Sequence, residues 1–353
     1  MDTIVVNATA LDTAGALTIL RQFIEAIPQD ENIKYIIFIS PFIQLQNKYS
    51  NIQLVPIYGV KSLICRFLWD AFGIRKWLRK NNIIPTISLS LQNTNFRTGY
   101  KIPNYVYYHQ SIPFFKRHWS FFNTQERPMW FYKNIYPFFV RIFLNKRTEI
   151  FVQLEFIRNG FTHKFGKDIH KIHVISPKIT TLISELPTEK YSLDLTCINL
   201  FYPATPFFYK NHKMLIDAIN RLKNKSIALY LTCNKTDIDY EVPDNVHFMG
   251  SISFSLVMSM YRMCDAMVFP SYIETYGLPL IEAASNGSLI IAADLPYARE
   301  VLTNYSGAVF IPYDKPDLWA KAIENVKKGT KYPPMKQNNL KSWNELFKII
   351  TKK

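Results

Sequence analysis

The sequence predicts an α/β protein made of two doubly wound domains, each with a parallel sheet. Three observations favour this fold class. Apolar strand patterns alternate with helix patterns, the alternation restarts after residue 195, and 353 residues exceed what one ordinary domain needs. Hydrophobic residues make up 48% of the chain and charged residues 20%, which is the balance of a soluble globular protein.

The first half reads as one alternating unit. Short apolar runs bounded by turn-forming residues predict strands over 3–7, 34–40, 53–57, 84–89, 105–109 and 149–152. A glycine-containing loop and a helix over 14–26 follow the first strand. A helix over 63–78 is expected from apolar residues at helical spacing: Leu63, Phe67, Ala71, Ile74 and Leu78. This alternation predicts a parallel sheet covered by helices on both faces.

A proline-containing polar stretch at 176–195 predicts the connection to the second half. Beyond it we expect strands over 196–201, 226–232, 245–249, 266–270, 289–292 and 308–311. Helices are expected over 213–222, 255–263, 280–286 and 316–326. The domains are therefore predicted as 1–176 and 177–337, facing each other across a cleft. Ligands of such sheets bind at the carboxyl ends of the strands.

Composition argues against several kinds of site. The four cysteines lie far apart without metal-ligand spacing, so buried thiols are expected rather than a zinc site or disulfide. Asp237 and Asp239 have the spacing of a metal-binding pair but lie in a charged, turn-like stretch, so no metal cofactor is predicted. No apolar run is long enough to span a membrane, and residues 1–6 lead directly into a strand pattern. We therefore expect neither a membrane span nor a signal peptide.

The net charge of +15 is concentrated in the first half. Residues 1–176 carry 22 Lys and Arg against 10 Asp and Glu, whereas residues 177–353 carry 20 against 17. A basic half suits anionic lipid or a phosphate-bearing substrate, or is simply a solvated surface. The aromatic and basic stretch 114–147 suits a membrane interface, a cleft wall or a core helix. No nucleic-acid motif accompanies it, so nucleic-acid binding is not expected.

The segment 268–287 contains the clearest chemical pattern, which is a strand, a loop and a helix. Glu274 lies in the loop, Gly277 permits a tight turn, and Pro279 suits the first helical turn. The helix start presents N–H groups and a positive dipole end, which favour an anion such as a diphosphate. Glu282 lies eight residues after Glu274 in the same crevice. Two acceptor-only carboxylates beside a phosphate cradle suit a nucleotide sugar, although an exposed Glu274 and a salt-bridged Glu282 remain the alternative.

This segment resembles the E-x7-E signature of the retaining glycosyltransferases of family 4, which have the GT-B fold. The similarity covers Phe-Pro-Ser-x-x-Glu-Thr-Tyr-Gly-Leu-Pro-Leu-x-Glu-Ala at 269–283. Further features agree in order along almost the whole chain: the N-terminal glycine loop, the strand before His109, the segment 202–212 and the segment 246–250. The subgroup most similar in pattern is the bacterial capsule and O-antigen sugar transferases. The GT-B fold implies two Rossmann-like domains with an interdomain cleft and a final helix, about 338–353, that crosses back onto the first domain.

The resemblance also implies the roles of single residues. Glu274 is expected to contact donor-sugar hydroxyls, Lys210 to neutralise the departing diphosphate, and His109 to touch the sugar near the reacting centre. These three are the expected catalytic residues, although a lone histidine or a surface lysine is often only structural. Glu282 is expected to hold the ribose. The other expected donor-binding positions are Thr275, Tyr276, Gly277, Leu278, Gly250 and Gly15. An arginine that the family usually has before the lysine is absent, and Ala204 stands at its place.

Together these features predict a retaining glycosyltransferase that moves a sugar from a nucleoside-diphosphate sugar to a growing surface glycan. The acceptor is expected to be linked to a polyprenyl carrier and to bind 1–176, and the donor to bind 177–337. The protein is expected to be cytoplasmic and peripheral at the inner face of the membrane. A nucleotide-sugar epimerase or phosphorylase of the same fold, and a non-catalytic glycan- or lipid-binding subunit, are the alternatives.

Overall fold

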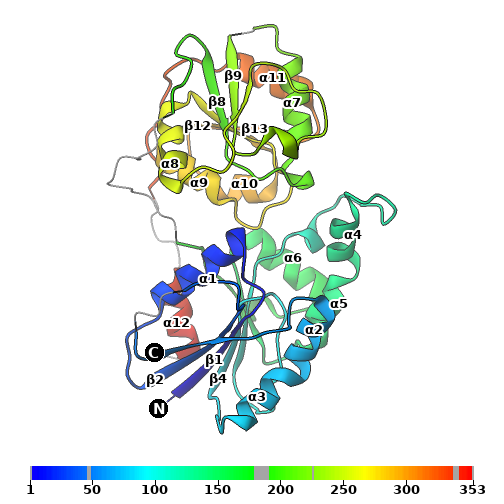
Figure 1. Ribbon diagram of the computed structural model, residues 1–353, viewed down its shortest axis with the longest axis vertical. Coiled ribbons are helices and arrows are strands. Elements are labelled where there is room, and N and C mark those ends of the chain that lie inside the picture. The colour runs from blue at the N-terminus through cyan, green and yellow to red at the C-terminus, as the bar shows by residue number, and fades with distance from the viewer. Residues whose placement is uncertain (1, 46–48, 179–190, 225, 337–341, 352–353) are drawn as a thin grey trace. The chain divides into compact units, whose positions relative to one another are not determined.

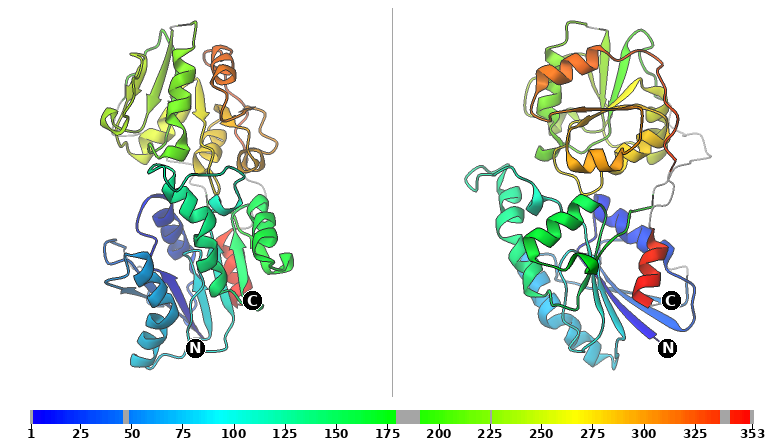
Figure 2. Two further views of the ribbon diagram at one scale, coloured as in Figure 1. Left: turned by 90° about the vertical axis from the view of Figure 1, so that its right-hand side faces the viewer. Right: turned by 180° about the vertical axis from the view of Figure 1, so that it is seen from behind.

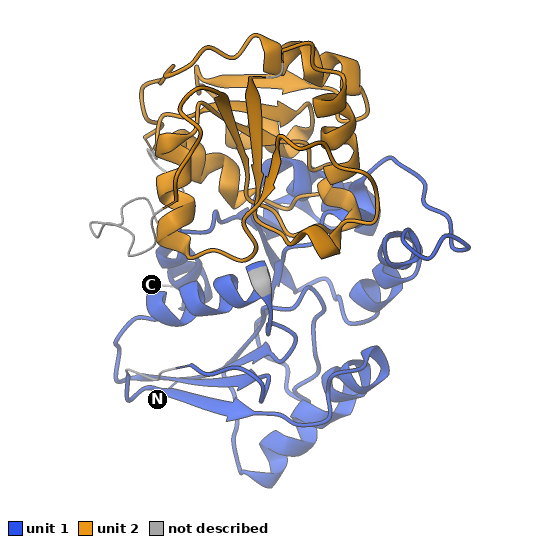
Figure 3. Ribbon diagram, turned by 45° about the horizontal axis from the view of Figure 1, so that its top comes forward, with its two compact units in different colours: residues 1–178, 339–353 blue, residues 179–338 orange. Residues whose placement is uncertain are grey.

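The computed structural model describes residues 2–45, 49–178, 191–224, 226–336 and 342–351. The chain forms two compact units, unit 1 (residues 1–178 with 339–353) and unit 2 (residues 179–338), coloured separately in Figure 3. Most of the expected connection at 176–195 lies outside the described residues. Each unit has one parallel sheet flanked by helices (Figure 1), so the predicted doubly wound α/β fold class is confirmed.

Seven parallel strands form the sheet of unit 1 in the order β3-β2-β1-β4-β5-β6-β7. Their bounds are β1 Asp2–Ala8, β2 Ile33–Ile39, β3 Ile52–Pro56, β4 Ile87–Ser90, β5 Asn104–Tyr108, β6 Glu149–Val152 and β7 Ile172–Val174. The strand expected over 84–89 therefore begins three residues later. The strand order reverses between β1 and β4, and such a switch point is where doubly wound sheets bind ligands.

Successive side chains of β1 point alternately to the two faces of this sheet, and each face has its own buried cluster. Ile4, Val6 and Ala8 belong to a buried cluster with α1 (Ala14–Ala26) and α12 (Trp343–Thr351). Val5 belongs to the cluster on the opposite face, with α3 (Ile74–Lys80). Asn7 lies two residues further along β1, so its side chain points to the same face as Val5.

The last helix is part of unit 1 (Figure 2). The Trp343 ring stacks on Tyr107 with centroids 4.9 Å apart, and its indole N–H donates to Gln22 Oε1 at 3.2 Å. Phe347 packs against Phe23 and Tyr35. The C-terminal helix thus packs on the first half of the chain, as expected for the GT-B fold.

The helix expected over 63–78 is confirmed, but its geometry changes along its length. The structure has α2 (Leu63–Leu68), a π-helical segment η1 (Trp69–Gly73) and then α3. Ala71, Ile74 and Leu78 are buried, but Leu63 is exposed. A π-turn adds a residue to the helical repeat and rotates the preceding turns relative to the following ones. The five apolar positions therefore do not all lie on the same face. The remaining helices of unit 1 are η2 Ile112–Phe114, α4 Arg127–Asn134, α5 Tyr136–Ile142, α6 Glu155–Phe165 and η3 Ile169–Lys171.

Six parallel strands form the sheet of unit 2 in the order β10-β9-β8-β11-β12-β13. Their bounds are β8 Ile198–Tyr202, β9 Ile227–Leu231, β10 Val246–Phe248, β11 Ala266–Phe269, β12 Leu289–Ala293 and β13 Ala308–Ile311. The helices are η4 Phe208–Lys210, α7 His212–Asn220, η5 Lys235–Asp237, α8 Phe254–Met263, α9 Leu278–Ser285, α10 Pro296–Val301 and α11 Pro316–Glu324. Here the order reverses between β8 and β11, which makes their carboxyl ends the expected binding edge.

Candidate active site

Lys210 and Glu274 meet at the switch point of unit 2. Lys210 ends η4, on the connection that follows β8, and Glu274 lies on the loop that follows β11. The Lys210 ammonium donates to Glu274 Oε1 at 2.5 Å, and only 16% and 14% of the two side chains are exposed. A largely buried ion pair at a ligand-binding edge offers a cation for an anionic ligand and a carboxylate acceptor for its hydroxyl groups.

Hydrogen bonds hold the two loops in register. The Tyr202 hydroxyl, at the end of β8, donates to the Lys210 carbonyl at 2.6 Å. The Tyr272 N–H, on the β11 loop, donates to the Tyr209 carbonyl at 3.0 Å. The acceptors of these two hydrogen bonds are the backbone carbonyls of Lys210 and Tyr209. The bonds therefore fix the backbone that carries the Lys210 side chain.

The start of α9 lies directly beyond Glu274. Gly277 precedes the helix with φ +82°, a left-handed conformation that side chains strain, and an added Cβ would lie 3.2 Å from Leu280. Pro279 occupies the first turn, where a missing N–H costs nothing. Thr275 and Tyr276 complete the loop. The amino end of this eight-residue helix therefore carries the positive dipole end next to the ion pair, an arrangement that suits a diphosphate.

Glu282 lies one turn further along α9, against α8. The Tyr261 hydroxyl donates to Glu282 Oε2 at 3.2 Å. Burial raises the pKa of Glu282 to about 7, and the hydrogen bond from Tyr261 opposes that rise. A carboxyl that is half ionised near neutral pH is typical of functional positions.

Three further positions that the sequence singled out also lie in unit 2. Gly250 follows β10 with φ +66°, and a Cβ there would lie 3.1 Å from Asn234 Oδ1. Ala204, at the place of the missing arginine, is buried. Asp237 is exposed and accepts from the Asn234 N–H as part of a capping box, which is a structural use of that carboxylate. Within the described residues, no three His, Cys, Asp or Glu side chains form a cluster that could hold a metal ion.

His109 directly follows β5 in unit 1 and is half-buried. Its Nε2–H donates to the Leu91 carbonyl at 2.9 Å, and its backbone N–H donates to Asn93 Oδ1 at 2.6 Å. Burial lowers the pKa of His109, so the ring is neutral at neutral pH. These contacts fix the ring at the carboxyl ends of β4 and β5.

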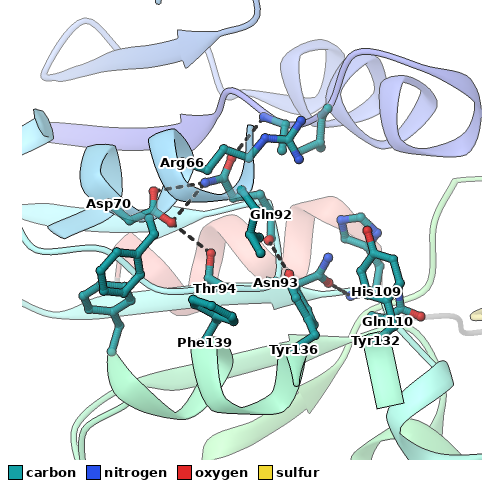
Figure 4. Close-up of a pocket in the computed structure, with 15 residues that line it drawn as sticks. Arg66, Asp70, Gln92, Asn93, Thr94, His109, Gln110, Tyr132, Tyr136 and Phe139 are labelled. Carbon is teal, nitrogen blue, oxygen red and sulfur yellow. Dashed lines mark hydrogen bonds between the residues drawn. The ribbon is translucent and has the colours of Figure 1, made fainter. Parts of the chain in front are cut away.

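His109 lines a cavity of about 160 Å³ at the switch point of unit 1, which Figure 4 shows. The floor of the cavity is the carboxyl group of Asp70, which is 3% exposed and comes from the π-helical segment. Asp70 accepts from the Asn7 amide at 2.7 Å, the Gln92 amide at 3.1 Å and the Thr94 hydroxyl at 3.0 Å. Sequence reasoning missed this group. The signal was a single acid within the basic and apolar stretch 61–80.

Burial raises the pKa of Asp70 to about 7, whereas the hydrogen bonds from Thr94, Asn7 and Gln92 act to lower it. A raised carboxyl pKa means that folding favours the protonated form, so stability is lost as pH rises toward 7. We expect the free energy of unfolding of the parent, relative to Asp70→Asn, to fall by about 4 kcal/mol between pH 4 and pH 8. Urea unfolding of both proteins across that range is the measurement. If the difference in unfolding free energy between the parent and Asp70→Asn does not change with pH, the raised pKa of Asp70 is contradicted.

Gly15 was expected at the end of the loop that follows β1. In the structure it lies in the first turn of α1. A Cβ at this position would meet no atom within 4 Å, and its φ is not positive. The structure therefore gives no steric reason for glycine here. The loop after β1 still reaches the cavity of unit 1, through Ala10 and Leu11.

Comparison with known proteins assigns the half of the chain that holds the ion pair. Residues 193–343 match the sequence profile described as "Glycosyl transferases group 1". This segment belongs to the group 1 glycosyl transferases. The O-antigen chain mannosyltransferase RfbU of Salmonella typhimurium is 29% identical over 184 residues, which are 48% of this chain and 48% of that protein. The chain spans about half the length, or less, of these curated relatives.

Solved structures extend the likeness to the fold of the whole chain. WaaG, a glycosyltransferase involved in lipopolysaccharide biosynthesis, superposes with a TM-score of 0.65 at 12% identity, covering 92% of this chain and 90% of that one. Anabaena Alr3699/HepE in complex with UDP and glucose gives 0.61 at 13% identity, covering 100% and 95%. The fold is therefore GT-B, with two Rossmann-like units, as the sequence predicted.

Proposed function

We propose that this protein is a retaining glycosyltransferase. It moves a sugar from a nucleoside-diphosphate sugar to a hydroxyl group of a growing surface glycan, such as a capsule or an O-antigen. The observation that carries the proposal is the Lys210–Glu274 pair at the switch point of unit 2, beside the amino end of α9. The names of relatives that act on O-antigen and lipopolysaccharide support the class of acceptor.

The donor is assigned to unit 2. Its diphosphate lies at the loop and first turn of α9 and next to the Lys210 ammonium, which offsets the charge that develops on the leaving group. Glu274 accepts from hydroxyl groups of the sugar, and Glu282 accepts from a ribose hydroxyl. The complex of Anabaena HepE with UDP and glucose supports a nucleotide-sugar donor.

Glu282→Ala is expected to weaken nucleoside-diphosphate binding by roughly 1.5–3 kcal/mol, because a charged acceptor of a ribose hydroxyl is lost. In the parent, affinity should rise with pH through about 7, as the Glu282 carboxyl ionises. Tyr261→Phe removes the donor that favours the ionised form, so this rise should move to higher pH. Calorimetric titration with UDP and GDP at pH 6 and pH 8 measures both effects. Normal affinity of Glu282→Ala would make this glutamate purely structural.

The acceptor is assigned to the cavity of unit 1, where polar groups from three strand ends meet aromatic walls. The tyrosines Tyr132 and Tyr136 and the imidazole of His109 suit a hydroxyl-rich ring. The contact of His109 with the donor sugar remains a prediction. With retention, the acceptor oxygen attacks the face that the diphosphate leaves. The bond from C1 to the diphosphate oxygen breaks, the bond from C1 to the acceptor oxygen forms, and the hydroxyl proton passes to the departing diphosphate.

A lipid-linked acceptor at the inner face of the membrane completes the proposal. Within the described residues, no helix combines the length and apolar character needed to cross a bilayer. The contact that we propose is peripheral, and the basic excess of residues 1–176 supports it.

The test uses a panel of nucleotide sugars. The proposal expects one of them to raise the melting temperature more than its free nucleotide does, and to donate its sugar to a glycan acceptor. Epimerisation of the bound sugar without transfer would favour the epimerase alternative. Stabilisation by glycans alone, without donor binding, would favour a non-catalytic subunit.

A further inference from the structure

Two packed helices of unit 1 expose a row of large apolar side chains. Ile64 and Leu68 lie four residues apart on α2, Phe72 follows in η1, and the three side chains are 71%, 49% and 62% exposed. Phe138 and Ile142 lie four residues apart on α5 and are 62% and 39% exposed. Side chains four residues apart lie on one side of a helix. We name these five residues the docking face.

The inner sides of the same helices hold them together. The Phe67 ring of α2 packs against Phe139 and Phe143 of the α5 region, with centroids 5.8 Å and 5.4 Å apart. Phe67, Phe139 and Phe143 also line the cavity that contains Asp70 and His109. The two helices therefore separate the cavity on one side from the docking face on the other.

The surroundings of the docking face are strongly basic. Residues 61–80 and 127–147 contain 11 Lys and Arg and one acid, Asp70, which is buried. The exposed cations are Lys61, Arg75, Lys76, Arg79, Lys80, Arg127, Arg141, Lys146 and Arg147. Exposed apolar side chains on segments that also carry many exposed cations match an anionic lipid surface, where the apolar groups enter the acyl boundary and the cations meet lipid phosphates.

The charge pattern argues against a second copy of the chain as the partner. A symmetric dimer through this face would place the same cations against one another, which costs free energy. The aromatic stretch 114–130 is a weaker membrane surface than the sequence suggested. Trp119 is buried there, and Arg117 is paired with Glu126 at 3.2 Å.

We propose that the docking face rests on an anionic lipid bilayer. Ile64, Leu68, Phe72, Phe138 and Ile142 enter the headgroup layer, and the surrounding lysines and arginines bind lipid phosphates. Resting on the proposed function, this contact presents the sugar of a lipid-linked acceptor to the cavity behind the helices, while its lipid stays in the bilayer.

The experiment is flotation of the full chain with two kinds of vesicle, phosphatidylcholine alone and phosphatidylcholine mixed with phosphatidylglycerol. The parent should bind the mixed vesicles and release them as salt rises. Leu68→Glu with Phe138→Glu should reduce binding at least about tenfold, because two apolar contacts become repelled charges. The matched control is Leu318→Glu with Phe254→Glu, two residues of unit 2 that are 46% and 43% exposed, and it should bind like the parent.

A second pair of variants isolates the charge. Arg75→Glu with Lys76→Glu should also lose binding, whereas Lys315→Glu with Lys321→Glu in unit 2 should not. Equal binding by docking-face variants and controls, or equal binding to neutral vesicles, would overturn the proposal. A dimer in light scattering that the docking-face variants dissociate would instead make a second copy the partner.

Two further readouts separate this proposal from the proposed function. The docking-face variants should keep the nucleotide-dependent rise in melting temperature of the parent, because the donor is assigned to unit 2. Vesicle binding without sugar transfer from any donor would defeat the proposed function and leave the docking face in place. Transfer to a soluble glycan without vesicle binding would support the proposed function and defeat the docking face.

Discussion

Glu274→Gln should bind nucleoside diphosphate about as well as the parent and lose about 100-fold or more in the rate of sugar transfer. The amide keeps the size of the side chain and an oxygen that can accept from the Lys210 ammonium. It removes the negative charge beside the donor sugar, where hydrogen bonds to hydroxyl groups tighten in the transition state. Steady-state transfer and calorimetric titration with the free nucleotide measure the two quantities.

The control for this variant is Glu241→Gln, which changes an exposed glutamate of the same unit. It should leave both transfer and nucleotide affinity unchanged. Unchanged turnover in Glu274→Gln would remove this residue from the mechanism. A loss of nucleotide affinity as large as the loss of transfer would show that it supports the binding loop instead.

Lys210→Met should reduce transfer by about 100- to 1000-fold, since the departing diphosphate loses the cation placed beside it. It should also weaken nucleotide binding, because Glu274 is 14% exposed and keeps its charge without a partner. Lys210→Arg should restore part of both. Single-turnover transfer and nucleotide titration separate the two effects.

Lys213→Met is the matched control, because Lys213 lies on α7 three residues later and its ammonium sits over the Tyr240 ring. This control should resemble the parent. Full activity of Lys210→Met would mean that another cation serves the leaving group.

Much of the fold could be predicted because buried parallel strands are continuous apolar runs. The runs at β1, β5, β11 and β12 have this character, and each forms a strand close to its expected bounds. The π-helical segment could not be predicted, because an added residue in one helical turn leaves no mark in composition. The helices α4, α5 and α6 carry many aromatic and basic residues, and this mixture hid their periodicity.

The candidate site was predicted unevenly for a physical reason. Glu274, Gly277 and Glu282 lie on one continuous strand–loop–helix segment, so local spacing is sufficient to group them. The contact between Lys210 and Glu274 joins residues 64 positions apart, and it depends on two strands that are neighbours in the sheet but not in the sequence. Asp70 gathers donors from Asn7, Gln92 and Thr94 in the same way, and no local pattern reveals such a network.

The most direct test of the central claim is the stereochemistry of the product. Proton NMR of the reaction with the donor that stabilises the protein follows the anomeric signal of the transferred sugar. A new glycosidic bond with the same anomeric configuration as the donor, formed as nucleoside diphosphate is released, is the result that the proposal predicts. An inverted product, or a donor that is consumed without any transfer, would contradict it.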